Sequence, residues 1–382
     1  MGLSLTPLLK KIKRRYMASS KTIFFTDSSM NIGGQELQAL QQMYALQAAG
    51  FKTLLLCKPN SALLQRSNAL GLAAIPIRFR NAFHILSFRQ LLLLVRSKDP
   101  IAIVSHGSHD ALLSVMVSWL AALLGGRRIP VLRVKTFQHG YPLFFAYNHL
   151  FSKTLTPSHH LRTLFLANRS IKPNKIEVLY PGIDFSGLSQ SDNALPDHVM
   201  RWLADHPGPV ISHGAILRGE KGHHIILNAL VEVKKSFPTV RYLIAGEGQD
   251  RPLLEAEIKA LGLEDHVYLT GILHKIAPLL NTITLAVLPS LIEPLGMFQI
   301  EAQYLGVPTI ASRVGGIPET ILHEETGLMV EPGNVPAWAD TICWVLQHPT
   351  EAKQLAERGK TFVTEKFSME RNTAELIKLI EV

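Results

Sequence analysis

The feature that most constrains the fold is a regular alternation of short apolar runs with longer amphipathic stretches. Residues 22–26 form the first apolar run, residues 36–49 an amphipathic stretch, and residues 53–56 the next run. A short apolar run fits a strand buried on both faces, and a longer amphipathic stretch fits a helix that covers one of them. The alternation therefore predicts βαβ units and an α/β fold built on parallel sheets.

The apolar runs fall into two series, separated by a polar segment. Further strands are predicted at residues 101–105, 130–134, 153–156 and 176–179, and then at 210–212, 240–245, 267–269, 285–288 and 309–311. The expected order is a basic N-terminal extension at 1–20, a first domain at 21–185, a linker with a short helix at 186–208, a second domain at 209–350, and C-terminal helices at 351–382, with the last helix able to pack back on the first domain. Two Rossmann-like domains in series would place the carboxyl ends of both sheets at a central cleft.

Composition narrows the class of protein further. The 382 residues are 47% apolar, enough to bury two cores, and the formal net charge of +9 favours anionic partners. Nucleic acid is not expected among them, because no basic helix, aromatic stacking motif or zinc finger is present. Cys57 and Cys343 are the two cysteines and stand far apart, which indicates no disulfide framework and a reducing cytoplasm.

Two segments bear on membrane association. The N-terminus is basic at residues 10–15, but the apolar run 23–25 is too short for a signal peptide, so export is not expected. Either translation starts at Met17, or this arm contacts a membrane surface. The apolar stretch 111–124 is too short to span a bilayer and is predicted to be a buried crossover helix; the alternative is that it docks on lipid together with residues 91–94.

The most informative stretch is 288–302, where a strand ends, a loop turns and a helix begins. The first helical amides are those of Gly296, Met297 and Phe298. Such amides and the positive end of the helix dipole suit a pyrophosphate. Glu293 in the loop and Glu301 about one turn into the helix can then address different parts of an elongated ligand. The simpler alternative is that Glu293 caps the helix through a favourable electrostatic interaction with the helix dipole, and that Glu301 is a solvated helical residue.

The surrounding residues resemble a known family. Glu293 and Glu301 are followed by Ala302, Gly-Val-Pro-Thr at 306–309 and Gly-Gly-Ile-Pro-Glu at 315–319, a pattern similar to the signature of family 4 retaining glycosyltransferases. Residues 245–271 and 22–36 also resemble that family, so the likeness covers most of residues 21–335. It implies the GT-B fold, with two Rossmann-like parallel-sheet domains facing a central cleft, and a nucleotide-sugar donor bound mainly by the second domain.

The resemblance also implies roles for individual residues. Glu293 would act on the donor sugar and Glu301 would bind the ribose, while the turn at Gly33 and Gly34 would approach the donor phosphates. Lys221 would neutralise the diphosphate without a metal ion. The family's arginine is missing, because Ala215 or Ile216 occupies its place, and Arg218 is the expected substitute.

Two histidines are candidates for a catalytic base. Family members keep a histidine after the strand at 130–134; here His139 comes about three residues late, with Thr136 in the usual place, and His106 is the second candidate. An ordinary polar loop residue is the alternative for either. His106 and His109 lack a third ligand, so no metal site is expected, and Arg251 replaces the third glycine of a dinucleotide-binding motif.

The implied reaction transfers a hexosyl or heptosyl group, with retention, from a UDP-, GDP- or ADP-sugar to a hydroxyl of a saccharide or lipid-linked acceptor, without a cofactor. The acceptor is expected to bind the first domain, where the following residues would suit an anionic lipid-linked saccharide: Arg80, Phe83, Phe88, Arg89 and Arg96. An anionic membrane surface is a further possible partner. This favours bacterial envelope (lipopolysaccharide) synthesis by a cytoplasmic protein peripheral to the inner membrane. The alternative is a catalytically inactive sugar-nucleotide-binding scaffold, which the missing arginine favours.

Overall fold

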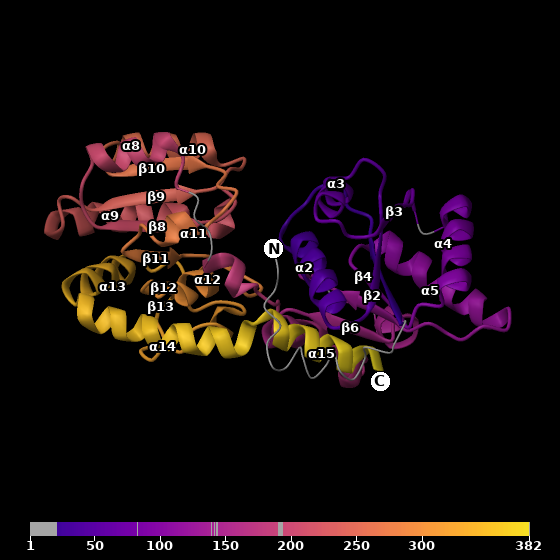
Figure 1. Cartoon of the computed structure of the whole chain (residues 1–382). Coiled ribbons are helices and arrows are strands. Elements are labelled where there is room, and N and C mark those ends of the chain that lie inside the picture. The colour runs from indigo at the N-terminus through magenta and orange to yellow at the C-terminus, as the bar shows by residue number, and fades with distance from the viewer. Residues whose placement is uncertain are drawn as a thin grey trace. The chain divides into compact units, whose positions relative to one another are not determined.

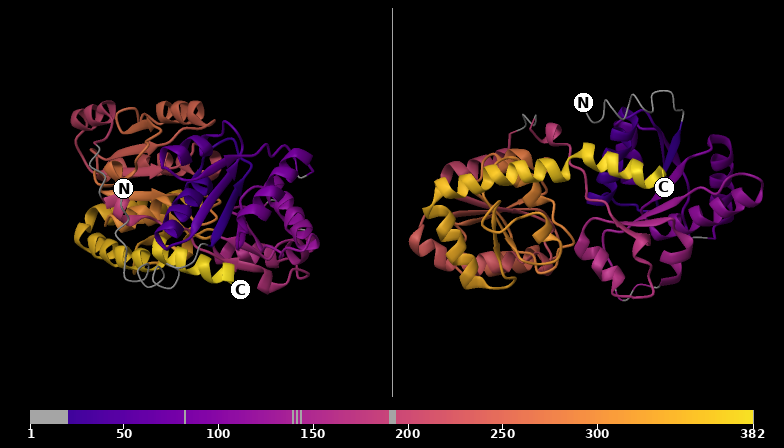
Figure 2. Two further views of the ribbon diagram at one scale, coloured as in Figure 1. Left: turned by 45° about the vertical axis from the view of Figure 1, so that its right-hand side comes forward. Right: turned by 90° about the horizontal axis from the view of Figure 1, so that it is seen from below.

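The computed structural model describes residues 21–381 except 82, 139, 141, 143 and 190–193. These residues form two compact units (Figure 1). The first comprises residues 21–184 and 367–381, and the second comprises 185–366. In each unit, helices lie on both sides of one sheet (Figure 2). The expected class, with two parallel-sheet α/β domains, is confirmed.

The first unit contains a sheet of seven parallel strands in the order β3-β2-β1-β4-β5-β6-β7. Its strands are β1 Thr22–Asp27, β2 Lys52–Cys57, β3 Ala74–Pro76, β4 Ala102–Ser105, β5 Val131–Val134, β6 Lys153–Thr156 and β7 Ile176–Val178. Its helices are α2 Gly34–Ala48, α3 Ala62–Ala69, α4 Ile85–Lys98, α5 Ser108–Leu123, α6 His159–Leu166 and α15 Met369–Glu381, with a π-helical turn at Ala146–Leu150 and a 3-10 turn at Pro173–Lys175.

The second unit contains six parallel strands in the order β10-β9-β8-β11-β12-β13. They are β8 Val210–Gly214, β9 Arg241–Ala245, β10 Val267–Gly271, β11 Leu285–Leu288, β12 Thr309–Ser312 and β13 Leu328–Val330. The helices are α7 Phe185–Ser189, α8 Asp197–Asp205, α9 His223–Ser236, α10 Arg251–Ala260, α11 Ala277–Leu280, α12 Phe298–Tyr304, α13 Val335–Gln347 and α14 Pro349–Phe367, with 3-10 turns at Gly219–Lys221 and Ile317–Glu319.

Burial on both faces explains why the strands are continuous apolar runs. Successive strand residues point to opposite faces, so Ile23 and Phe25 of β1 pack in the core that includes residues of α2 and α15, whereas Phe24 packs in the core with α4 and α5. Every predicted run corresponds to a strand. The sequence pattern missed β3 and β13, which are three residues long and lie at sheet edges, where little apolar sequence is needed.

The N-terminal part of the first unit ends at residue 184, next to the expected limit at 185, but the other divisions differ from those expected from the sequence. Segment 186–208, expected as a linker, lies in the second unit, where Val199 of α8 is fully buried in the core with Leu243. That unit continues through α14 to residue 366, past the expected limit at 350. Only α15 returns to the first unit, where Leu376 and Ile380 join the core beside α2.

The apolar helix α5 connects the neighbouring strands β4 and β5, as expected of a crossover helix. Its buried residues include Ala111, Leu113 and Val117, whereas Trp119 and Leu123 are exposed. Among the residues that the structure describes, no helix is both long enough and apolar enough to cross a bilayer.

Candidate functional site in the second unit

The strand order of the second sheet reverses between β8 and β11, which are neighbours in the centre of the sheet. In open α/β sheets, ligands bind outside the carboxyl ends of the strands beside such a switch point. Lys221 follows β8 and Glu293 follows β11. The topology therefore brings these two predicted residues together at the place where a ligand is expected.

Lys221 and Glu293 form an ion pair. The Lys221 Nζ lies 2.7 Å from Glu293 Oε2, and the two side chains are 19% and 10% exposed. The Ser290 hydroxyl lies 3.4 Å from the same carboxylate oxygen. An ammonium group carries three N–H donors, so this pair leaves donors of Lys221 for an oxyanion. Its partial burial strengthens any such contact relative to one at the open surface.

Three loops hold Glu293 in place. The Leu291 N–H donates to the Glu220 carbonyl at 2.8 Å, which ties the β11 loop to the β8 loop. The Gly316 N–H donates to the Glu293 carbonyl at 3.0 Å, which ties it to the β12 loop. Gly315 adopts φ +59°, and a side chain there would collide with the backbone of Glu293. The glycine pair of the sequence motif is therefore required for close packing around Glu293.

Glu301 is not the solvated helical residue of the simpler alternative. It lies on α12 and is half-buried, and burial raises the pKa of its carboxyl from 4.5 to about 7. Within the described part of the chain, no side chain forms an ion pair or hydrogen bond with this carboxyl. A desolvated carboxylate without a partner is suited to accept hydrogen bonds from ligand hydroxyls.

The start of α12 differs from the expected pyrophosphate cradle in one respect. Gly296 has φ +85° and turns the chain into the helix, which begins at Phe298 after Met297 and is only seven residues long. The first amides of a helix have no acceptor within it, so these N–H groups suit an anion. Because α12 is short, its dipole adds little, and the amides themselves would carry the contact.

The two candidate positions of the missing arginine are both apolar: Ala215 is half-buried, and Ile216 has 44% of its surface accessible. Arg218 forms only a long, exposed ion pair with Glu220, at 3.7 Å. Arg218 is thus not fixed toward Glu293 in the way that Lys221 is. Of the two predicted phosphate-binding cations, Lys221 contacts Glu293, whereas Arg218 lies at the surface.

The sequence analysis missed a buried histidine pair beside Lys221. The rings of His213 and His223 stack with their centroids 4.4 Å apart. Burial, together with the nearby charge of Lys221, holds the pKa of His213 well below its usual range and lowers that of His223 to about 4. Both rings are therefore neutral at pH 7, and Lys221 supplies the positive charge. His213 belongs to the largely apolar strand β8, so its sequence context is typical of a core residue.

Predicted residues in the first unit

Gly33 and Gly34 lie after β1, which borders the switch point of the first sheet at β4. The Gly33 N–H donates to Glu36 Oε2 at 2.8 Å, so this amide is already used in capping α2. Gly34 starts α2 and, among the described residues, no atom lies within 4 Å of where its Cβ would be. The fold therefore does not require a glycine at position 34. That this turn lets the backbone approach a ligand stays a prediction.

His106 lies in a buried polar cluster. Its ring stacks on Phe25 at 6.1 Å, its Nδ1 lies 3.3 Å from the Thr26 carbonyl, and burial lowers its pKa. Asp110 accepts a hydrogen bond from the Thr26 hydroxyl at 2.8 Å, and burial raises the pKa of nearby Asp27 to about 7. The sequence analysis missed both aspartates. His139 lies outside the described residues, so His106 is the candidate base whose surroundings are known.

No metal site emerges in the described parts of the chain, where no three His, Cys, Asp or Glu side chains converge. His109 is exposed on α5, whereas His106 is buried.

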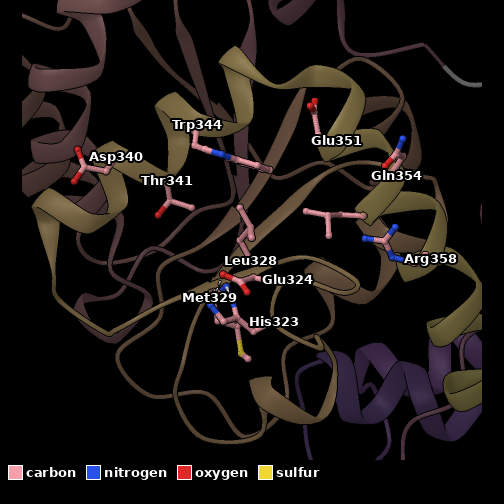
Figure 3. Close-up of a pocket in the computed structure, with 11 residues that line it drawn as sticks. His323, Glu324, Leu328, Met329, Asp340, Thr341, Trp344, Glu351, Gln354 and Arg358 are labelled. Carbon is pink, nitrogen blue, oxygen red and sulfur yellow. Dashed lines mark hydrogen bonds and ion pairs between the residues drawn. The ribbon is translucent and has the colours of Figure 1, made fainter.

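A separate pocket of about 670 Å³ lies in the second unit at the edge strand β13 (Figure 3). It lies between β13, α13 and α14, and its lining includes Trp344, His323 and Arg358. The His323 Nδ1 accepts the Met329 N–H at 3.0 Å, and the Arg358 Nε donates to the Glu325 carbonyl at 2.6 Å. These polar groups thus serve the fold, and no predicted site residue lines the pocket.

Relation to known proteins

Two family models and a solved structure are similar to this chain. Residues 201–362 match the model "Glycosyl transferases group 1", and residues 32–186 match "Glycosyltransferase Family 4". HepE from Anabaena, solved with UDP, superposes with a TM-score of 0.80 at 18% identity, covering 94% of this chain and 99% of that one. The two parallel-sheet units therefore define a GT-B glycosyltransferase fold. The chain belongs to family 4 of these proteins.

Among relatives of known name, the α-D-kanosaminyltransferase of Streptomyces kanamyceticus is 31% identical over 42% of this chain and 42% of its own length. The N-acetyl-α-D-glucosaminyl L-malate synthase of Bacillus anthracis is 29% identical over 53% of this chain and 52% of its own length. The chain thus spans about half the length of the relatives it matches.

Proposed function

We propose that the chain is a retaining glycosyltransferase that moves a sugar from a nucleoside-diphosphate sugar to an acceptor hydroxyl. The observation that carries this proposal is the 2.7 Å contact between Lys221 and Glu293 at the switch point of the second sheet. The unpartnered carboxyl of Glu301 lies on the helix that follows the Glu293 loop. Together they supply a cation for a diphosphate and two carboxylates for hydroxyl groups.

Catalysis would be mainly electrostatic. As the bond from the anomeric carbon to the diphosphate oxygen breaks, negative charge grows on that oxygen, and Lys221 with the amides at Gly296–Phe298 would stabilise it. Glu293 would hold the sugar and Glu301 the ribose. The acceptor oxygen forms the new bond to the anomeric carbon, and its proton passes to the departing phosphate or to a base. His106 and His139 are the proposed bases, and Gly33, Gly34 and Arg218 the further proposed phosphate contacts.

A catalytically inactive sugar-nucleotide-binding protein is the second candidate function. It is favoured by the apolar residue, Ala215 or Ile216, that stands where an arginine would otherwise reinforce Lys221. The two functions share a donor site and differ in turnover. Release of nucleoside diphosphate from a bound sugar nucleotide, in the presence of acceptor extract, would support the enzyme. Binding of the same nucleotide without any release would support the inactive protein.

The first experiment is a thermal-shift panel of UDP-, GDP- and ADP-sugars, with and without magnesium. UDP is the first choice because HepE was solved with it. We expect one donor at a saturating concentration to raise the melting temperature by about 2–4 °C without magnesium. Glu301→Ala should abolish this shift, whereas Glu351→Ala, an exposed site on α14, should keep it. An equal shift in wild type and Glu301→Ala would contradict the proposed site.

The acceptor is proposed to be a saccharide or a lipid-linked saccharide of the bacterial envelope, such as lipopolysaccharide, reached from the cytoplasmic face of the membrane. Support comes from α4 and the residue before its N-cap, where Phe83, Ile85 and Leu86 are 79%, 79% and 69% exposed. The same helix carries Arg89 and Arg96. Exposed apolar side chains next to arginines suit the interface of an anionic bilayer.

This membrane contact can be measured by co-sedimentation with phosphatidylglycerol vesicles at low salt. Changing Ile85 and Leu86 to Ser should weaken binding several-fold, whereas changing Leu253 to Ser, exposed on α10 of the other unit, should not. Wild-type protein that stays in the supernatant would refute the membrane contact and favour a soluble acceptor.

A further inference from the structure

The first unit contains a buried cation without an acidic partner. Arg133, the third residue of β5, is 9% exposed. Within the described residues, no carboxylate oxygen lies within 4.0 Å of its side-chain nitrogens, and its Nε has no hydrogen-bond partner. Buried arginines are normally paired, because desolvating an unpaired charge is costly. An unpaired guanidinium at the carboxyl end of a strand therefore points to an anion that comes from outside the chain.

The guanidinium lies beside the start of a long helix. Its Nη2 donates to the Ser108 hydroxyl at 3.0 Å, and Ser108 is the first residue of the sixteen-residue helix α5. Ser108 is exposed, so this end of Arg133 can be reached from solvent. The first-turn amides of α5 and its positive dipole end add to the attraction for an anion.

A second cation lies close by. Lys135 follows β5 directly, and its pKa is lowered by burial and then by the charge of Arg133. Two cations that repel each other are stabilised when an anion binds between them. The aromatic ring of Phe151, 5.0 Å from the Arg133 guanidinium carbon, compensates only part of the desolvation.

Two acidic side chains act on Arg133 from a distance. Burial lowers the pKa of Arg133, and Tyr147 and then Asp110 oppose this shift. The Asp110 Oδ2 accepts hydrogen bonds from the Thr26 hydroxyl and, at 3.3 Å, from the Gly107 N–H. Its charge is thus used in capping α5 and in the cluster with His106. It neutralises one of the two cations only partly, and a net positive site remains.

We propose that Arg133, Lys135 and Ser108 bind a phosphate group of the acceptor at the carboxyl end of β5. Identifying the ligand as the acceptor rests on the proposed transferase function; binding of phosphate itself does not. The site would select acceptors that carry a phosphate group. It lies in the unit that does not contain Lys221, Glu293 and Glu301, so it can be tested separately from the donor site.

The test measures the melting temperature in inorganic phosphate at about 50 mM against chloride of equal ionic strength. We expect phosphate to raise the wild-type value by about 2–4 °C and acetate to raise it less. Arg133→Met should lose the phosphate shift while its apolar stem still covers Phe151. Arg127→Met is the matched control, since Arg127 is half-exposed and bonded to Asp99; it should keep the shift.

Ser108→Asp is a second variant that tests the same site and is expected to fold. An aspartate at the first turn of α5 favours the helix and gives Arg133 an internal carboxylate, so the variant should be at least as stable as wild type and insensitive to phosphate. A full phosphate shift in Ser108→Asp or Arg133→Met, or none in wild type, would overturn the proposal. Sugar nucleotides assayed on the same samples report the donor site, so absence of any nucleotide shift alongside an intact phosphate shift would refute only the transferase.

Discussion

At the scale of single residues, the second unit separates two carboxylates that the sequence presents as a pair. Glu293 is neutralised by Lys221 and fixed by three loops, whereas Glu301 is desolvated and has no partner within the described residues. Their chemical states therefore differ. Glu293 is held as part of an ion pair. The pKa of Glu301 is close to physiological pH, so ligand binding and solvent pH both change the protonation of its carboxyl.

Glu301→Gln should make the stability of the protein less dependent on pH. The folded-state pKa is raised from 4.5 to about 7, so Glu301 contributes its full stability below pH 4.5, and that contribution is lost as pH rises toward and through 7. We expect the variant to gain about 1–3 kcal/mol on wild type between pH 5 and pH 8, measured by urea unfolding. A pH-independent difference would show that the Glu301 carboxyl is not desolvated.

At the scale of elements, the loops after β8, β11 and β12 form the candidate site because their strands are adjacent in the sheet. The sequence predicted the strands, since each is an apolar run, and it predicted Glu293 and Glu301 through their motif. It could not predict that Lys221 pairs with Glu293, because this contact depends on the order of the strands. It likewise missed Asp27, whose raised pKa arises from burial and from Asp110, which is distant in sequence.

Two glycines with nearly the same backbone conformation allow a matched test of these loops. Gly315 has φ +59° and no room for a Cβ, whereas Gly262 has φ +60° and, among the described residues, open space there. Gly262→Ala should cost about 1–2 kcal/mol, the strain of a left-handed alanine. Gly315→Ala should cost at least about 3 kcal/mol and abolish the nucleotide-induced shift, because it displaces the Glu293 backbone. Equal losses in both variants would contradict this packing argument.

At the scale of the whole molecule, the chain crosses between the two units twice, and the crossings are hydrogen-bonded to each other. The Ile183 N–H donates to the Phe367 carbonyl at 2.8 Å, and the Met369 N–H donates to the Ile183 carbonyl at 3.1 Å. Beyond this point, Asn372 of α15 donates to the Tyr180 carbonyl at 2.6 Å and accepts from Gln42 at 3.0 Å. The C-terminal helix is thus an integral part of the first unit. The sequence analysis allowed for this packing of the last helix on the first domain. It interpreted segment 186–208 as a linker, whereas α8 of that segment packs in the core of the second unit.

The two cores should respond to mutation separately. Leu376 of α15 is fully buried with Leu40 and Met43 of α2, so Leu376→Ala should destabilise the first unit by about 2–5 kcal/mol. Lys378→Ala, exposed on the same helix, should have little effect.

Because Lys221, Glu293 and Glu301 lie in the other unit, a sugar nucleotide should still raise the melting temperature of that unit in Leu376→Ala. Calorimetry should then show two transitions, with the mutation lowering one and the nucleotide raising the other. A single transition lowered by the mutation and raised by the nucleotide would instead mean that the two units unfold cooperatively.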